Sequence, residues 1–159
     1  MRPQDLPDEI PASKAHLRLW LRLLKTNRLI EAELRERLRV QFGTTLPRFD
    51  VMAALHRNPK GMKMSELSRM LMVSNGNVTG IIDRLTEDAL VLREAVPGDR
   101  RAARVRLTKA GVAEFERQAC VHEQWVSELL GGLDACDSRQ LADTLEVALT
   151  VREEGADHG

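Results

Sequence analysis

Two groups of residues near the middle of the chain have side chains suited to contacts with a polyanion. The first is a set of small polar positions, Ser74, Asn75, Gly76, Asn77 and Thr79. Asn can pair bidentately with adenine in a major groove. Lys or Glu would be the ordinary choice on a helix that only faces solvent, so this composition indicates a contact surface. Ser74 also has the chemistry of a helix N-cap, and the two roles are compatible.

The second group is a cluster of five arginines between positions 93 and 106. Arginine presents a planar fork of donors that binds phosphate, and it also enters narrow minor grooves. Taken alone, an arginine-rich turn is typical of a solvated hairpin. Its position soon after the polar residues 74–79 favours nucleic-acid contact instead.

The elements that must position the polar residues form a helix-turn-helix. A short helix buried through Leu67 and Met70 is expected over residues 65–71, followed by a tight turn over 72–74. The next helix is expected over residues 75–88, because its apolar residues recur at steps of three and four: Val78, Ile81, Ile82 and Leu85. This stripe would dock the helix and leave its first turn free to read a groove.

A β-hairpin should follow, because side chains alternate over residues 90–96 and 104–107 and Pro, Gly and Asp stand at the bend. A helix-turn-helix followed by an arginine-tipped hairpin is a winged helix. We expect Arg101, held by Asp99, to enter a minor groove. The predicted DNA-binding residues are Ser74, Asn75, Asn77, Thr79 and Arg84 on the helix side and Arg100, Arg101 and Arg104 in the wing.

Four further helices complete the predicted fold, which is mainly α, with six helices and a small β-hairpin wing. Ser13 is expected to cap the first helix, which runs to Gly43. The second helix tolerates Pro47 in its first turn. Thr108 is expected to cap the fifth helix, and Asp137 to begin a capping box for the sixth.

The first helix is remote in sequence from the fifth and sixth helices, yet each of the three carries an apolar face. They are therefore expected to pack together and against a second copy of the chain, as a homodimer. This organisation predicts an N-terminal dimerisation helix over residues 1–47, a winged helix-turn-helix lobe over 48–108 and C-terminal dimerisation helices over 109–159. The three parts would form one integrated domain.

The zero net charge of the chain conceals an asymmetry along its length. Residues 48–110 carry 12 Lys and Arg against 7 Asp and Glu, whereas residues 111–159 carry 3 against 11. A basic segment beside an acidic one is expected when one lobe faces a polyanion and the other must not.

The residue pattern gives no sign of catalysis, a cofactor or a metal site. The four histidines do not cluster, and Cys120 and Cys136 lack metal-ligand spacing. No Gly-rich phosphate loop or HExxH motif occurs. Charged residues interrupt every apolar run, and the N-terminus lacks the apolar stretch of a secretion signal. We therefore expect a cytoplasmic protein without a membrane partner.

The segment DRRAARVRLT, residues 99–108, fits a known wing signature of Asp, one residue, Arg, five residues and Leu-Thr. With Leu67, Val78-Thr79 and the Asp83-Arg84-Leu85 run, it makes residues 12–152 resemble the multiple antibiotic resistance regulator (MarR) family. The resemblance implies a homodimer that binds a palindromic operator, usually as a repressor released by a small ligand. The chain departs from the family at Gly80, where many members carry a basic residue.

Within that family, residues 46–52 and 73–80 are similar to regulators of aromatic-acid breakdown, especially of hydroxycinnamates. Some of those regulators respond to coenzyme A thioesters. The family binds ligands between the dimerisation helices and the winged lobe, which implies a pocket of the first, second and fifth helices. The residues implied for it are His16, Trp20, Arg22, Lys25, Arg48, Phe49, Met52 and Trp125. For Trp20 and Trp125, packing in a dimer core is the alternative.

Two other functions are compatible with a winged helix. A thiol-based redox sensor would use Cys120 or Cys136, but relatives of that kind pair an early cysteine with tyrosines, and this chain has no Tyr. The cysteines are therefore expected to be packing residues. A ligand-independent architectural DNA-binding protein would share the basic lobe without needing the wing motif.

Overall fold

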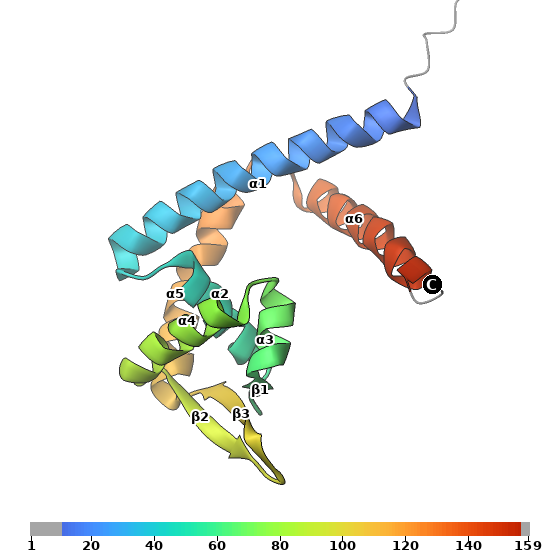
Figure 1. Ribbon diagram of the computed structural model, residues 1–159. Coiled ribbons are helices and arrows are strands. Elements are labelled where there is room, and N and C mark those ends of the chain that lie inside the picture. The colour runs from blue at the N-terminus through green and yellow to red at the C-terminus, as the bar shows by residue number, and fades with distance from the viewer. Residues whose placement is uncertain (1–10, 157–159) are drawn as a thin grey trace, which may run out of the picture. The chain divides into compact units, whose positions relative to one another are not determined.

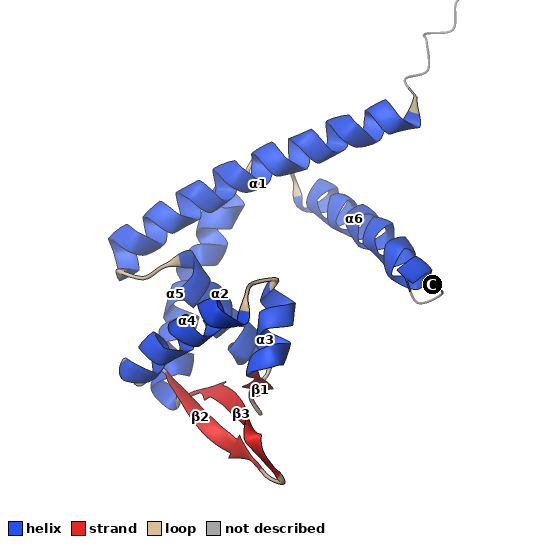
Figure 2. Ribbon diagram, in the orientation of Figure 1, coloured by secondary structure: helices blue, strands red, loops and turns tan. Residues whose placement is uncertain are grey.

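The computed structural model (Figure 1) describes residues 11–156, except for the side chains at positions 100, 101, 149 and 151–156. The chain divides into two compact units, the first ending at His122 and the second beginning at Glu123. The described residues contain six helices and a small three-stranded sheet. Figure 2 colours the helices blue and the strands red. The predicted mainly α fold with a β wing is confirmed.

Helix α1 (Ala12–Phe42) is followed closely by α2 (Leu46–Arg57). Ser13 lies inside α1, whose N-cap is Pro11, so the predicted Ser13 cap is wrong. The helix ends at Gly43, which adopts the left-handed conformation at φ 60° that favours glycine. Thr45 caps α2 by accepting a hydrogen bond from the Arg48 N–H, and Pro47 stands in the first turn as expected.

The helix-turn-helix consists of α3 (Met64–Leu71) and α4 (Asn75–Glu87), close to their predicted bounds. Met72 ends α3 in a left-handed conformation at φ 54°, and Ser74 caps α4 by accepting from the Asn77 N–H at 3.4 Å. Val78, Ile82 and Leu85 are 0% exposed. Burying such side chains contributes about 1.5–3 kcal/mol each, so this stripe fixes α4 in the lobe.

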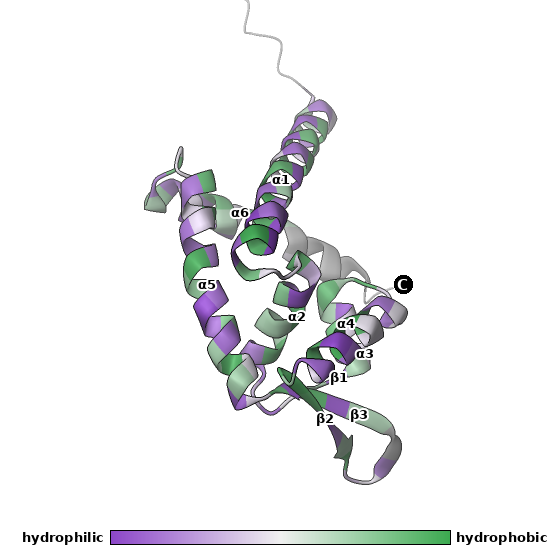
Figure 3. Cartoon of the chain, turned by 90° about the vertical axis from the view of Figure 1, so that its left-hand side faces the viewer, coloured by the Kyte–Doolittle hydropathy of each residue, from purple (hydrophilic) through white to green (hydrophobic). Residues whose placement is uncertain are grey.

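The hairpin of β2 (Val91–Val96) and β3 (Asp99–Leu107) extends beyond the helices of the lobe in Figures 1 and 3. The prediction placed the start of the second arm at Arg104, but β3 begins at Asp99 and pairs there with Val96. A register shift between Ala95 and Val96 accommodates the short turn. The sequence analysis missed β1 (Met62–Lys63), which pairs with β3 to give the antiparallel order β1-β3-β2.

Helix α5 (Lys109–Leu129) begins beside the sheet, and α6 (Ala135–Ala156) belongs to the second unit. Thr108 caps α5 as predicted, because its hydroxyl accepts from the Gly111 N–H at 3.0 Å. The same hydroxyl donates to the Ala89 carbonyl. The cap of α6 is Asp134, which accepts from the Asp137 N–H, so the predicted start at Asp137 is three residues late.

Aromatic residues join α2 to the first part of α5. Phe49, 5% exposed, stacks on His122 with ring centroids 4.4 Å apart and lies 5.4 Å from Phe115. Burial lowers the pKa of the His122 imidazole, because a low-dielectric surrounding disfavours its charged form.

The close approach of α5 to Leu90 predicts an unusual response of Gly111 to substitution. A Cβ at Gly111 would lie 2.0 Å from the Leu90 carbonyl oxygen, whereas a Cβ at Gly80, also helical, meets no atom within 4 Å. Gly111→Ala should therefore lower the free energy of unfolding by about 1–3 kcal/mol or more. Gly80→Ala should raise it by about 0.5–1 kcal/mol through helix propensity. Urea unfolding measures both, and equal effects of the two substitutions would contradict the packing described.

The buried imidazole predicts a pH dependence of stability. Since the pKa of folded His122 lies below the unfolded value of about 6.5, its contribution is present above that pH and is lost as the pH falls through the folded pKa. His122→Phe retains a ring for Phe49 but cannot titrate. Unfolding free energies measured from pH 8 to pH 5 should fall more steeply for the wild type than for the variant. Parallel curves would show that His122 carries no such effect.

Candidate nucleic-acid interface

The outer face of α4 presents the small polar residues that the sequence singled out. Asn75, Asn77 and Thr79 are exposed, in contrast to the buried stripe on the same helix. The Thr79 hydroxyl donates to the Asn75 carbonyl at 2.9 Å, which leaves its oxygen able to accept from a ligand. Ser74 serves as the N-cap, so the capping role considered for it is real. The helix can therefore offer amide groups to base edges while its own backbone is satisfied.

Ion pairs brace the wing against α4 and within its own strands. Arg93 of β2 donates to the Asp83 carboxylate of α4, and Arg106 donates to Glu94 across the hairpin at 2.7 Å. These two arginines are engaged in the protein. The Arg84 guanidinium is exposed and has no ion pair or hydrogen bond within the described part of the chain, so it is available for a phosphate.

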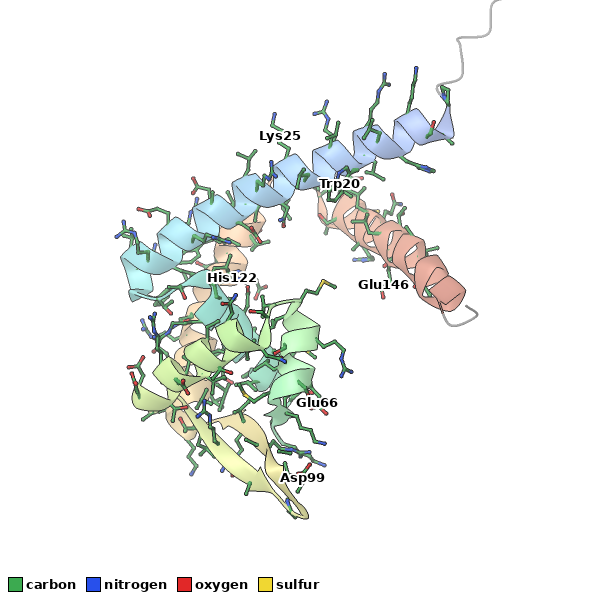
Figure 4. All side chains as sticks on the ribbon, in the orientation of Figure 1. Trp20, Lys25, Glu66, Asp99, His122 and Glu146 are labelled. Carbon is green, nitrogen blue, oxygen red and sulfur yellow. The ribbon has the colours of Figure 1, made fainter. Side chains whose placement is uncertain are left out.

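The predicted wing arginines are only partly described. Arg100 and Arg101 lie in β3, and their side chains fall outside the described residues. Asp99 begins β3 and is labelled in Figure 4 at the wing. Arg104 lies further along β3, opposite Glu94 on one side and Lys63 on the other. The contacts of all three arginines with DNA stay predictions.

Arg104 packs against Gly61, a glycine that the sequence indicates only as part of the stop after the second helix. A Cβ at Gly61 would lie 2.7 Å from the Arg104 Cγ and 2.8 Å from the Val105 carbonyl oxygen. Gly61 also has a φ of 91°, which favours glycine. The Arg104 Nε is buried without a hydrogen-bond partner. A Gly after Asn-Pro-Lys was the available signal, but it indicates only a turn.

A cleft of about 680 Å³ adjoins the outer face of α4. Its walls come from the last turns of α1, the start of α2 and the side of α4 that carries Gly76, Gly80 and Arg84. Arg35 and Arg39 contribute from α1, and Arg48 from α2. The cleft falls in the size range of small-molecule sites, about 300–1,000 Å³.

The predicted effector residues are not brought together within the first unit. Phe49 and Met52 are core residues, and Arg48 lines the cleft beside α4. His16, Trp20, Arg22 and Lys25 stand on the exposed first half of α1, where Figure 4 labels Trp20 and Lys25. Trp125 is 5% exposed and belongs to the second unit. The pocket implied for them remains a prediction.

The cysteines, metal ligands and apolar helices give no further site among the described residues. Cys120 and Cys136 are free and exposed, so the prediction that they are packing residues is wrong for the single chain. No group of three potential metal ligands occurs in the described part of the chain. Of the helices described, none combines the length and apolarity needed to span a membrane.

Comparison with known proteins identifies the family to which this geometry belongs. The model of the MarR family matches residues 42–102. The crystal structure of a MarR family transcriptional regulator from Silicibacter pomeroyi is 31% identical, with a TM-score of 0.75, and the alignment covers 91% of this chain and 99% of that one. Operator DNA is bound in a crystal structure of a mutant MarR from E. coli, which is 26% identical with a TM-score of 0.73. That alignment covers 85% of this chain and 96% of the other.

Among curated proteins, the transcriptional repressor IacR of Pseudomonas putida is 30% identical over 112 residues. That alignment covers 70% of this chain and 66% of IacR, just under two thirds of its length. The structural match, in contrast, runs nearly the whole length of both chains. The winged helix-turn-helix chain described above belongs to the MarR family of transcriptional regulators and is not an enzyme.

Proposed function

We propose that the protein is a ligand-responsive repressor that binds a palindromic DNA operator as a homodimer. The observation that carries this proposal is the division of α4 into two faces. Val78, Ile82 and Leu85 are wholly buried, while Asn75, Asn77 and Thr79 are exposed. A helix anchored in this way holds its polar face in a fixed orientation to a major groove.

The proposed contacts divide between α4 and the wing. Asn75 and Asn77 would read base edges, with Ser74 and Thr79 beside them, and Arg84 would meet a phosphate. Arg101 would enter the neighbouring minor groove, with Arg100 and Arg104 at phosphates. The proposed role of the wing is supported by the ion pair between Arg93 and Asp83, which connects the hairpin to α4. The structure of E. coli MarR in complex with operator DNA supports a DNA-binding role for this chain.

Unburied apolar residues on α1 support the homodimer. Leu17, Leu19, Trp20 and Leu21 are each more than half exposed, and Figure 3 shows apolar and polar positions alternating along the helix. A single chain leaves this surface in water, so a second copy is the partner we propose for it. A two-fold assembly would present two reading helices to half-sites separated by about one turn, roughly 10 base pairs.

The effector we propose is an aromatic acid or its coenzyme A thioester. Its support is the similarity of residues 46–52 and 73–80 to regulators of aromatic-acid breakdown. We propose that the protein is a repressor because IacR, a relative that is 30% identical, is named as a transcriptional repressor. The ligand must bind the DNA-incompetent arrangement more tightly, since equal affinity for both arrangements would shift neither. Binding to chromosomal DNA would make the protein cytoplasmic.

Selection from a random duplex library tests the DNA-binding proposal and predicts the role of Arg101. The full chain should enrich an inverted repeat with half-sites about 10 base pairs apart. Arg101→Ala should weaken binding to that duplex by about 1–3 kcal/mol, because a groove contact is lost. Arg139→Ala, an exposed substitution in α6, is the matched control and should bind normally.

Three outcomes would contradict this proposal in different parts. Enrichment without any consensus would favour the ligand-independent architectural protein. A consensus sequence with a single half-site would exclude the proposed binding of the operator by a homodimer. Unchanged affinity of the Arg101 variant, measured by fluorescence anisotropy, would exclude the proposed role of the wing.

A further inference from the structure

Strand β1 places a lysine beside a wing arginine on the outer face of the sheet. In the pairing of β1 with β3, Met62 stands opposite Val105 and Lys63 stands opposite Arg104. Met62 and Val105 are 5% and 0% exposed, so their pair faces the core. Because side chains alternate along a strand, the neighbouring pair of Lys63 and Arg104 faces outward. Directly opposite residues have Cβ atoms about 4.5–5.5 Å apart, which brings the two cations together.

The acidic residues near this pair are engaged elsewhere. Glu94 stands opposite Arg104 on the other side of β3, but its carboxylate accepts from Arg106 at 2.7 Å. Glu66 accepts from the backbone N–H of Lys63 at 3.0 Å, which caps α3 and leaves the ammonium group unused. Within the described part of the chain, neither Lys63 nor Arg104 has an ion pair. Like charges directly opposite each other destabilise a sheet, so a bound anion would relieve this pair.

The turn before β1 holds the Arg104 side chain in place. A Cβ at Gly61 would lie 2.7 Å from the Arg104 Cγ, so the stem of the arginine runs along the glycine. The Arg104 Nε is buried and lacks a hydrogen-bond partner. A side chain that is already held loses little conformational freedom when it binds a ligand. An oxygen of that ligand would supply the acceptor that the guanidinium lacks.

The pair of Lys63 and Arg104 lies between the wing and the helix-turn-helix. Figure 1 shows β1 between α3 and the hairpin. Strand β1 leads directly into α3, and β3 runs from the wing tip past Arg104. If α4 and the wing enter neighbouring grooves, one phosphate backbone separates those grooves. A backbone in that position would pass the surface between α3 and the wing.

We infer that Lys63 and Arg104 together bind one phosphate group of the DNA backbone. The inference rests on the proposed binding to DNA, and it adds β1 to α4 and the wing as an element that contacts the duplex. The lysine supplies a point charge and the arginine supplies directed donors. Phosphate contacts fix the position of a protein on DNA without reading sequence. The pair should therefore increase the affinity for any duplex and leave sequence preference to α4.

The salt dependence of DNA binding tests this inference. Fluorescence anisotropy of the full chain with its selected duplex gives the slope of log affinity against log salt concentration. Lys63→Gln should reduce the magnitude of that slope by about 1 for each bound copy of the chain. It should weaken binding to the selected duplex and to a scrambled duplex by the same factor, about fivefold or more.

Two matched variants control for charge and position. Lys63→Arg retains the positive charge and should keep the slope of the wild type. Lys109→Gln removes an exposed lysine at the start of α5 and should also leave the slope unchanged. Because residues that share a partner are coupled, the losses from Lys63→Gln and Arg104→Gln should not add in the double variant. The urea midpoint of Lys63→Gln should not fall, since the substitution removes a like-charge contact.

The outcomes separate this inference from the proposed function. An unchanged slope in Lys63→Gln, an equal change in Lys109→Gln, or an altered sequence preference would overturn the phosphate site. Additive losses in the double variant would overturn the shared phosphate, and a lower urea midpoint would contradict the uncompensated pair. If the wild type selects no consensus, the proposed operator binding fails. The same slopes measured with a random duplex would then still test the phosphate site.

Discussion

The docking of α4 by its buried aliphatic stripe is the interaction on which the rest of the structure depends. Val78, Ile82 and Leu85 are inaccessible to solvent, and with Leu67 of α3 they join the core that holds Met52 and Leu55 of α2. Because a helix has only one face toward its core, burial of this stripe determines which residues α4 presents outward. The small outward residues can then approach another molecule closely, and Gly76 and Gly80 leave open space beside them.

The wing is attached to the same helix by polar contacts of a different kind. Arg93 reaches Asp83, the Thr108 hydroxyl bridges the Ala89 carbonyl to the first turn of α5, and β1 extends the hairpin into a sheet. Exposed ion pairs add little stability individually, typically about 0–1 kcal/mol. Their main effect is on orientation, because they constrain the angle between the strands of the wing and α4. Direct contacts therefore connect α4 and the wing within the same unit.

Local patterns in the sequence predicted the elements, and tertiary contacts explain what was missed. The step of three and four residues identified α4, and the side-chain chemistry of Ser74 and Thr108 identified two caps correctly. Asp134 and Asp137 both fit the capping rule, so sequence could not choose between them. Strand β1 exists only because β3 pairs with it, and the contact of Gly61 with Arg104 joins residues far apart in the chain. The cleft needs three packed segments at once, which periodicity does not reveal.

Site-directed cleavage of DNA tests the central claim, that α4 is held in the major groove with its buried stripe inward. Cys120 and Cys136 are exposed and would first be replaced by Ser. A single cysteine is then introduced by Glu87→Cys at an exposed position of α4. An iron chelate attached to that cysteine cleaves the DNA sugars near it. On the selected duplex, cleavage should concentrate at the edges of two major-groove segments roughly 10 base pairs apart. Cleavage spread evenly along the duplex, or centred on a minor groove, would contradict the account.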